Sequence, residues 1–202
     1  MRISWILMSM RRAFRRSLGK YLTVKRSYLR GILAGRKTAT IRLGVVYVPY
    51  RRVFLECGGR VYGELEITDV KYRRLNELDE HMAREDGFAS LGELIAALTG
   101  IYPSITPEDT VTIIRFRLLA RYPEPVSRWD VEYRGDVNVQ ELSRRALARG
   151  LVRSREEYKI LHILAEGASF DEAAAAMGAN YTPSFIKAIF ARVAKRLSEC
   201  GF

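Results

Sequence analysis

The sequence contains few residues of the types that bind metals or form disulfides. It has two cysteines, Cys57 and Cys200, and two histidines, His81 and His162, in 202 residues. Two cysteines cannot build a disulfide framework, and no Cys-x-x-Cys pair or Cys/His cluster has the spacing of a zinc site. Each histidine is interpreted as an ordinary helix residue. The sequence therefore predicts neither a metal site nor a cofactor.

Long hydrophobic runs are also missing. A helix that crosses a membrane needs about 20 consecutive apolar residues, and no run in this sequence approaches that length. The apolar stretch ISWILM at 3–8 is too short and too poorly flanked for a signal peptide. The sequence predicts no membrane span, and its low cysteine content favours a cytoplasmic protein in a reducing compartment.

Acidic residues are nearly absent from the start of the chain. Residues 1–60 hold 15 Lys and Arg against the single acid Glu56, whereas residues 61–202 hold 19 Lys and Arg against 22 acids. The net charge of +11 is therefore concentrated near the start. This asymmetry favours a partner that carries phosphates, because cations that neutralise phosphates release counterions. The alternative is that the basic charge only keeps the protein soluble.

The first 121 residues combine strand and helix patterns. After a basic extension over 1–19, strands are marked by alternation and β-branched residues, and helices by apolar residues at helical spacing. Strands are expected at 20–25, 38–43, 53–75 (two strands joined at Gly58-Gly59) and 110–119, and helices at 26–35, 76–86 and 90–102. Gly35 stands where a helix ends in a left-handed residue, and Ser90 begins a capping box. The pattern predicts an α+β fold with a small mixed sheet curled into a barrel and helices at its side.

The remaining sequence is predominantly helical. Residues 121–130 contain two prolines and few apolar residues, which predicts a linker, and a short helix follows and ends at Gly150. Helix starts are then predicted at the capping residues Ser154, Ser169 and Thr182. The predicted organisation is an extension at 1–19, a domain at 20–121, a linker with a short helix at 122–149 and an all-α domain at 150–202.

The first domain resembles the ASCH family, a group of small β-barrel domains in the PUA-like superfamily. The resemblance covers roughly residues 20–120 and rests on the segments ILAGRKTATIRLG, ITDVKYRRLNEL, HMAREDGFASLGELIAALTGIYP and VTIIRFRL. Its main signature is Gly-x-Lys-x-x-Thr-x-Arg, at Gly35, Lys37, Thr40 and Arg42. The resemblance implies a cleft beside the barrel that this motif lines and that suits RNA or a nucleotide.

Two functions are compatible with that resemblance. In the first, the domain binds RNA through the cationic and hydroxyl side chains of Lys25, Arg36, Lys37, Thr40 and Arg42. In the second, it is an amidohydrolase that deacetylates N(4)-acetylcytidine or a related nucleoside, with Lys37, Thr40 and Asp86 as catalytic residues; members linked to RNA cleavage add a ribonuclease as a variant. The hydrolases have a glutamate where this sequence has Asp86, with Glu85 beside it, and aspartate is one methylene shorter. The binding hypothesis is preferred.

The C-terminal domain resembles the four-helix type of helix-turn-helix unit found in response regulators and sigma factors. By that resemblance, the helix that begins at Thr182 reads DNA. Residues near the major groove or its phosphates would be Thr182, Ser184, Lys187, Ala188, Ala191, Arg192 and Lys195. Residues 150–202 hold seven Lys and Arg against six acids, and a dedicated DNA-binding domain is usually more basic. A protein-interaction or dimerisation module is therefore the alternative, and the sequence predicts no oligomeric state.

Overall fold

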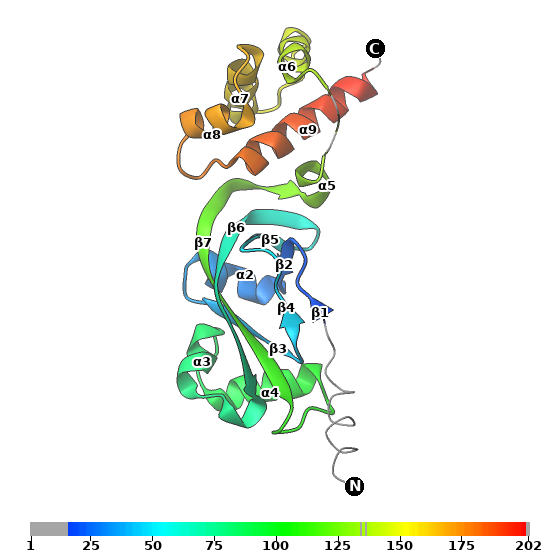
Figure 1. Ribbon diagram of the computed structural model, residues 1–202. Helices are drawn as coiled ribbons and strands as arrows, with labels where there is room; N and C mark the ends of the chain where they lie inside the picture. Colours follow the sequence, from blue (N-terminus) through cyan, green and yellow to red (C-terminus); the bar gives the residue numbers. More distant parts are fainter. Residues whose placement is uncertain (1–15, 134, 136, 201–202) are drawn as a thin grey trace. The chain divides into compact units, whose positions relative to one another are not determined.

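The chain divides into two compact units in the computed structural model, which describes residues 16–133, 135 and 137–200 (Figure 1). We call the first the sheet unit; it contains the residues up to Cys57 together with Glu64–Leu119. The second, the helical unit, contains Gly58–Gly63 and the residues from Ala120 onward. Most of the predicted basic extension, residues 1–15, lies outside the described residues.

The sheet unit is built on a five-stranded mixed sheet with the strand order β2-β5-β6-β7-β3. Strand β2 pairs parallel with β5, and β3 pairs antiparallel with β7. A separate parallel pair is formed by β1 and β4. The bounds are β1 Arg16–Ser17, β2 Tyr21–Thr23, β3 Ala39–Leu43, β4 Val46–Tyr47, β5 Arg52–Cys57, β6 Arg60–Arg74 and β7 Thr110–Ser127. The α+β class is confirmed. Strands β2 and β3 are the outer strands of this order, and closure into a barrel stays a prediction.

Two turns position the strands as the sequence predicted. Gly58 and Gly59 adopt φ angles of 60° and 78° and join β5 to its neighbour β6. Gly35 adopts a φ of 69° just after the helix α2 (Arg26–Leu33). Both sites need a left-handed backbone that other residue types rarely adopt.

The core of the sheet unit lies between the sheet and its helices α3 (Glu80–Glu85) and α4 (Leu91–Ile101), with a short 3-10 turn at Leu75–Glu77 between β6 and α3 (Figure 1). Alternate residues of a strand face the same side, so Ala39 and Ile41 of β3 share a face with Val111 and Ile113 of β7. These four side chains pack with helix residues such as Leu94 and Leu98 in one buried cluster. Burial of this apolar face holds α3 and α4 against β3.

The predicted helix starts are confirmed, with one difference in detail. At each start the cap hydroxyl accepts a hydrogen bond from the amide three residues later, as predicted for Ser90, Ser154, Ser169 and Thr182. Only Ser169 has the full capping box, in which Glu172 accepts from the Ser169 amide. At the other two serines the glutamate instead accepts from the amide before the cap, that of Ala89 or Arg153.

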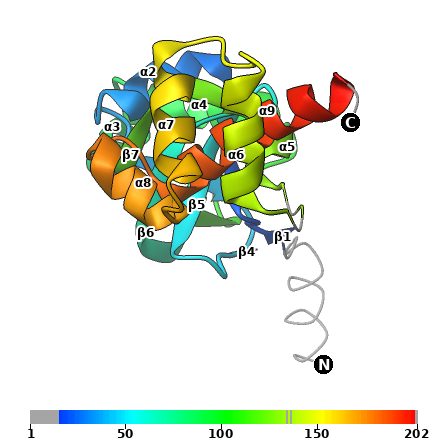
Figure 2. The ribbon, with the colours of Figure 1, turned by 90° about the horizontal axis from the view of Figure 1, so that it is seen from above.

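The helical unit is organised around α9 (Pro183–Glu199), which packs against the other helices of the unit (Figures 1 and 2). Those helices are α5 Arg128–Val131, α6 Val139–Ala148, α7 Arg155–Ala165 and α8 Phe170–Met177. The predicted apolar stripe is confirmed, because Phe185, Ile189, Val193 and Leu197 are all buried. Burial also extends to neighbouring positions, among them Ile186, Ala188, Phe190 and Ala191. Helix α9 is therefore the central helix of the unit.

The structure differs from the linker predicted at 121–130. Strand β7 continues to Ser127, and α5 follows directly. Tyr122 and Val126 are buried while Pro123 is exposed, so the inward and outward alternation of a strand persists through the prolines. Strand β3 pairs with β7 only over residues 111–115, so the prolines lie on a stretch of β7 that has no β3 neighbour. Proline is tolerated where a strand needs no amide donor.

No helix in the described part of the chain is both long enough and apolar enough to cross a membrane. Within the same residues, no group of three or more His, Cys, Asp or Glu side chains is arranged to hold a metal ion.

Substitution of Gly63 tests whether β6 and β7 must approach closely at this residue. A Cβ atom added there would overlap the carbonyl oxygen of Ala120 and lie 3.3 Å from the Arg121 Cα atom. Gly63→Ala is expected to lower the free energy of unfolding by about 1–3 kcal/mol, because the strands must separate to make room. Urea denaturation measures this change. Gly100→Ala in α4 is the control, since a Cβ there meets nothing within 4 Å; equal destabilisation of both variants would contradict the prediction.

Candidate functional site

The turn after α2 directs Lys37 into the protein. The amides of Arg36 and Lys37 both donate to the Gly31 carbonyl oxygen, at 2.9 and 3.2 Å. The Lys37 side chain then runs between two glycines: a Cβ added to Gly31 or Gly87 would lie 3.5 or 3.4 Å from the Lys37 Cβ atom. A methyl group at either position would touch the lysine stem at ordinary contact distance, and the φ of 87° at Gly87 is one that other residue types rarely adopt. Local backbone geometry therefore buries a side chain that usually remains exposed.

The Lys37 ammonium group ends against Asp86, the residue that follows α3. Lys37 Nζ donates to the Asp86 carbonyl oxygen at 2.5 Å and forms an ion pair with Asp86 Oδ1. The ring of Tyr28 lies beside it, with its centroid 4.8 Å from Nζ. Lys37 and Asp86 are each only 4% exposed. The structure thus brings together two of the three residues predicted for catalysis.

Asp86 also accepts a hydrogen bond from the outer edge of β3, the side that has no neighbouring strand. Its second carboxylate oxygen, Oδ2, accepts from the Ile41 amide at 2.9 Å. The Thr38 amide nearby donates to the Glu85 carbonyl oxygen at 2.8 Å. An outer strand otherwise leaves such donors without a partner in the sheet. The C-terminal end of α3 therefore satisfies β3 and holds Lys37 at the same point.

The protonation of Lys37 reflects its burial. Burial, followed by the positive charge of Arg42, lowers the pKa of Lys37 from its usual 10.5 to about 7. The Asp86 carboxylate beside it acts in the opposite direction, since an adjacent negative charge favours the charged ammonium. A lysine that titrates near neutral pH is a recognised feature of catalytic sites and also of buried structural pairs.

Glu85, the other acid near this point, has a different partner. The Arg115 guanidinium donates to both Glu85 oxygens, at 2.8–3.1 Å, and to Asp69 at 2.9 Å. The hydrogen bond that Arg115 donates to Glu85 is the main reason that the pKa of Arg115 is raised. Glu85 therefore ties α3 to the sheet, and Asp86 is the acid that reaches Lys37.

A groove opens beside Lys37 between α2 and the end of α3, and we call it the α2–α3 groove. Its volume is about 470 Å³, and its lining residues are Ser27, Tyr28, Arg30, Gly31, Arg36, Lys37, Arg84, Gly87, Phe88 and Ala89. Arg30, Arg36 and Arg84 are exposed, and no Asp or Glu lines the groove. The rings of Tyr28 and Phe88 meet edge to face, with centroids 6.1 Å apart. The groove thus combines cations with an aromatic wall.

The predicted binding residues of the sheet unit are only partly gathered at this groove. Arg36 lines it, and Lys37 lines it with its stem while its ammonium points to Asp86. Lys25 is exposed at the start of α2 and is not part of the lining. Arg42 does not line the groove: its Nη2 donates to the Thr23 carbonyl oxygen at 3.5 Å, burial lowers its pKa, and its charge acts on Lys37.

Thr40 comes directly before Ile41, whose amide donates to Asp86 Oδ2 at 2.9 Å. It is partly buried in β3, pairs in register with Ile114, and follows Ala39 on the opposite face of the strand. Among the described contacts, its hydroxyl makes none with Lys37 or Asp86. The structure thus pairs Lys37 with Asp86, and a catalytic role of the Thr40 hydroxyl stays a prediction.

The cationic and aromatic lining residues other than Arg36 and Lys37 were not predicted as site residues: Tyr28, Arg30, Arg84 and Phe88. Tyr28 and Arg30 lie on α2 just before the glycine-lysine signature, and Arg84 and Phe88 flank Asp86 and Gly87. All four lie near Lys37 or Asp86 in the sequence, and this closeness could have indicated them as site residues. Their convergence depends on α3 packing against β3, which no local pattern shows.

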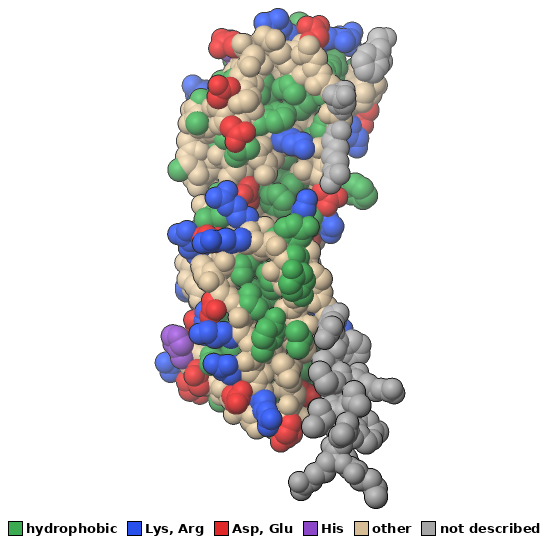
Figure 3. All heavy atoms as spheres, viewed as in Figure 1, with side chains coloured by type: hydrophobic (Ala, Val, Ile, Leu, Met, Phe, Trp, Pro, Cys, Tyr) green, Lys and Arg blue, Asp and Glu red, His purple; other side chains and the backbone are tan. Residues whose placement is uncertain are grey.

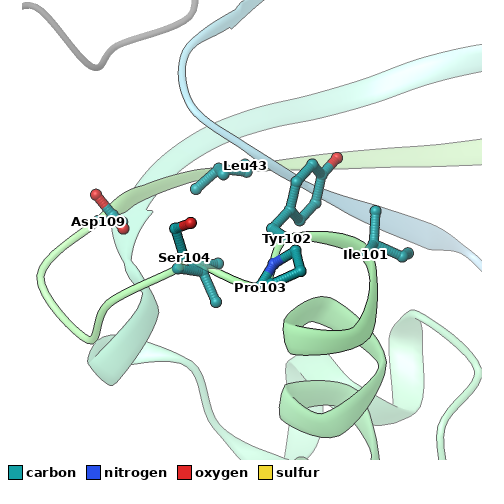
Figure 4. Close-up of a pocket in the computed structure, with 7 residues that line it drawn as sticks. Leu43, Ile101, Tyr102, Pro103, Ser104 and Asp109 are labelled. Atoms are coloured by element: carbon teal, nitrogen blue, oxygen red, sulfur yellow. The ribbon is translucent and has the colours of Figure 1, made fainter.

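A second pocket of about 330 Å³ lies after α4 (Figure 4). Leu43 and Ile101–Ile105 form most of its wall, and Asp109 lies at one side. The Asp109 carboxylate accepts from the Thr106 amide at 2.7 Å. Its lining has no cation and includes a carboxylate, so this pocket suits a phosphate poorly.

The residues predicted to approach DNA lie on or before α9, in different surroundings. Thr182 is the N-cap, Ser184 and Lys187 are partly exposed, and Lys195 is exposed. Arg192 lies 2.8 Å from Glu124 and within 4.0 Å of Asp130 and Glu157. Ala188 and Ala191 are buried. These contacts direct much of the helix into its own unit, so DNA binding by α9 stays a prediction that they do not favour.

Comparisons with known proteins found similarity only among solved structures. No family model and no curated protein matches this chain. The chain is similar to an ASCH domain from Lactobacillus crispatus, with 17% identity over 54% of this chain and 82% of that one and a TM-score of 0.43. It is also similar to ASCH from Zymomonas mobilis, with 13% identity over 55% of this chain and 75% of that one and a TM-score of 0.43. At these TM-scores the likeness carries no argument about the site.

The Lys37–Asp86 pair is open to a double-mutant test. Lys37→Met is expected to destabilise the protein by about 3–5 kcal/mol, because Asp86 then keeps a buried charge without its partner. Asp86→Asn added to Lys37→Met removes that charge and keeps an oxygen for the Ile41 amide, so it should recover about 1 kcal/mol or more. Urea denaturation of the single and double variants measures both effects. A double variant no more stable than Lys37→Met would show that the two side chains are not coupled.

Proposed function

We propose that the protein binds RNA, or a nucleotide of it, in the α2–α3 groove. One observation carries the proposal: three exposed arginines, Arg30, Arg36 and Arg84, surround an aromatic wall. Within the described residues, none of the three has an ion-pair partner. Guanidinium groups bind phosphates in bidentate fashion, and aromatic rings stack on bases. A polyanion with flat rings therefore matches both the arginines and the aromatic wall of the groove.

Lys37 and the three arginines of the groove have different roles. Lys37 is engaged by Asp86 beneath the groove and acts as a positioning residue for its floor. The arginines above it meet solvent and are the groups that would contact phosphates. The basic first 60 residues would add long-range attraction for a polyanion. The sequence resemblance to ASCH domains favours RNA as that polyanion.

Charge reversal in the groove tests the proposal. Arg36→Glu with Arg84→Glu is expected to weaken binding of a short single-stranded RNA by at least about tenfold. The slope of log K against log salt concentration should become shallower by about 1.4, because two phosphate contacts of about 0.7 each are lost. Fluorescence anisotropy at several salt concentrations gives both quantities.

The matched control is Arg155→Glu with Lys159→Glu on α7, which changes the net charge equally at exposed positions outside the groove. The control should retain most of the affinity. If both double variants lost the same affinity for RNA, the loss would follow from net charge alone and would contradict a site in the groove.

An amidohydrolase is the second candidate, favoured by the low pKa of Lys37 and by its contact with Asp86. The binding proposal predicts no release of acetate from N(4)-acetylcytidine and no cleavage of RNA at high protein concentration. Thr40→Val removes only the hydroxyl from a partly exposed strand position. Turnover by the unmodified protein that Thr40→Val abolishes would instead assign that hydroxyl as a nucleophile and favour the enzyme.

A further inference from the structure

A second surface of the sheet unit, apart from the groove, exposes three tyrosines. Tyr47 of β4 is 66% exposed, Tyr50 in the following loop 42%, and Tyr72 of β6 45%. Figure 3 shows hydrophobic side chains gathered over this part of the sheet unit. Exposed aromatic rings of this size are costly to hydrate and commonly mark a binding surface. We call it the tyrosine surface.

The three tyrosines are held close to one another by the strands. The Tyr72 hydroxyl donates to the carbonyl oxygen of Val46, the neighbour of Tyr47, at 3.3 Å. Tyr50 lines a shallow hollow of about 440 Å³ formed by residues 48–51 and 67–70. The one acid of this hollow, Asp69, is paired with Arg115 at 2.9 Å and Lys71 at 3.4 Å. The tyrosine surface thus offers exposed aromatic rings at and beside β4, next to a concavity.

Cations accompany these rings. Lys20 Nζ lies 5.8 Å from the centroid of the Tyr50 ring. Arg51 and Arg117 both pair with Glu66, at 2.9 and 2.5 Å, so that carboxylate is more than neutralised. Arg52 is exposed at the start of β5.

We infer that the tyrosine surface binds single-stranded nucleic acid, with bases stacked on Tyr47, Tyr50 and Tyr72 and phosphates near Lys20, Arg51 and Arg52. Cations between rings favour a polyanion with flat bases, and stacking on aromatic side chains tolerates any sequence. A purely apolar protein partner would not use this excess of positive charge. The inference extends the proposed function to a second contact and does not depend on the groove.

Substitution of the three rings tests the inference. The triple variant Tyr47→Ala, Tyr50→Ala and Tyr72→Ala is expected to bind a 15-nucleotide oligouridylate about tenfold or more weakly, since each stacked base contributes measurably to affinity. The matched triple variant to Phe keeps the rings and should bind within about threefold of the unmodified protein. Fluorescence anisotropy gives the affinities, and circular dichroism checks that both variants fold.

Photocrosslinking separates the two surfaces. Crosslinks of the oligouridylate to peptides with Tyr47, Tyr50 or Tyr72 should persist in the Arg36→Glu and Arg84→Glu variant, even if the groove proposal fails. Crosslinks confined to Tyr28 or Phe88, or an Ala variant that binds like the Phe variant, would overturn the inference.

Discussion

The buried pair of Lys37 and Asp86 is the interaction on which the sheet unit's site depends. It joins three elements that are far apart in the sequence: the turn after α2, the end of α3 and the outer edge of β3. Each partner alone would be a buried charge, which is strongly unfavourable. Both glycines beside Lys37, Gly31 and Gly87, leave room for its stem. The α2–α3 groove exists because this pair fixes its two walls next to one another.

That arrangement separates a structural cation from the cations that we propose bind phosphate. The Lys37 ammonium is committed to Asp86, whereas Arg30, Arg36 and Arg84 remain exposed around Tyr28 and Phe88. A buried ion pair often contributes less to stability than to specifying one geometry, and we assign that role to Lys37 and Asp86 in this protein. The consequence is a preformed groove, so a ligand would not have to order its walls. A preorganised site loses less free energy to ordering on binding.

The sequence predicted those features that local chemistry determines. Gly35, the Gly58-Gly59 hairpin and the capping hydroxyls needed only a few neighbouring residues, and all are confirmed. The contact of Lys37 with Asp86 was accessible only through the family resemblance, since 49 positions separate them. Two features depend instead on how α3 packs against β3. These are the inward direction of the Lys37 ammonium and the position of Arg84 beside the groove. The linker predicted from the prolines at 123 and 125 was wrong, because the burial of Tyr122 and Val126 outweighed the local turn preference of proline.

The central claim is that a nucleotide chain enters the α2–α3 groove, and backbone amide shifts report its position directly. In a titration of ¹⁵N-labelled protein with a short single-stranded RNA, the account predicts progressive shifts of the Gly31, Arg36 and Gly87 amides, which border the groove. Amides of α7 in the helical unit should remain unchanged. Saturable binding that leaves the three groove amides unshifted would contradict the account.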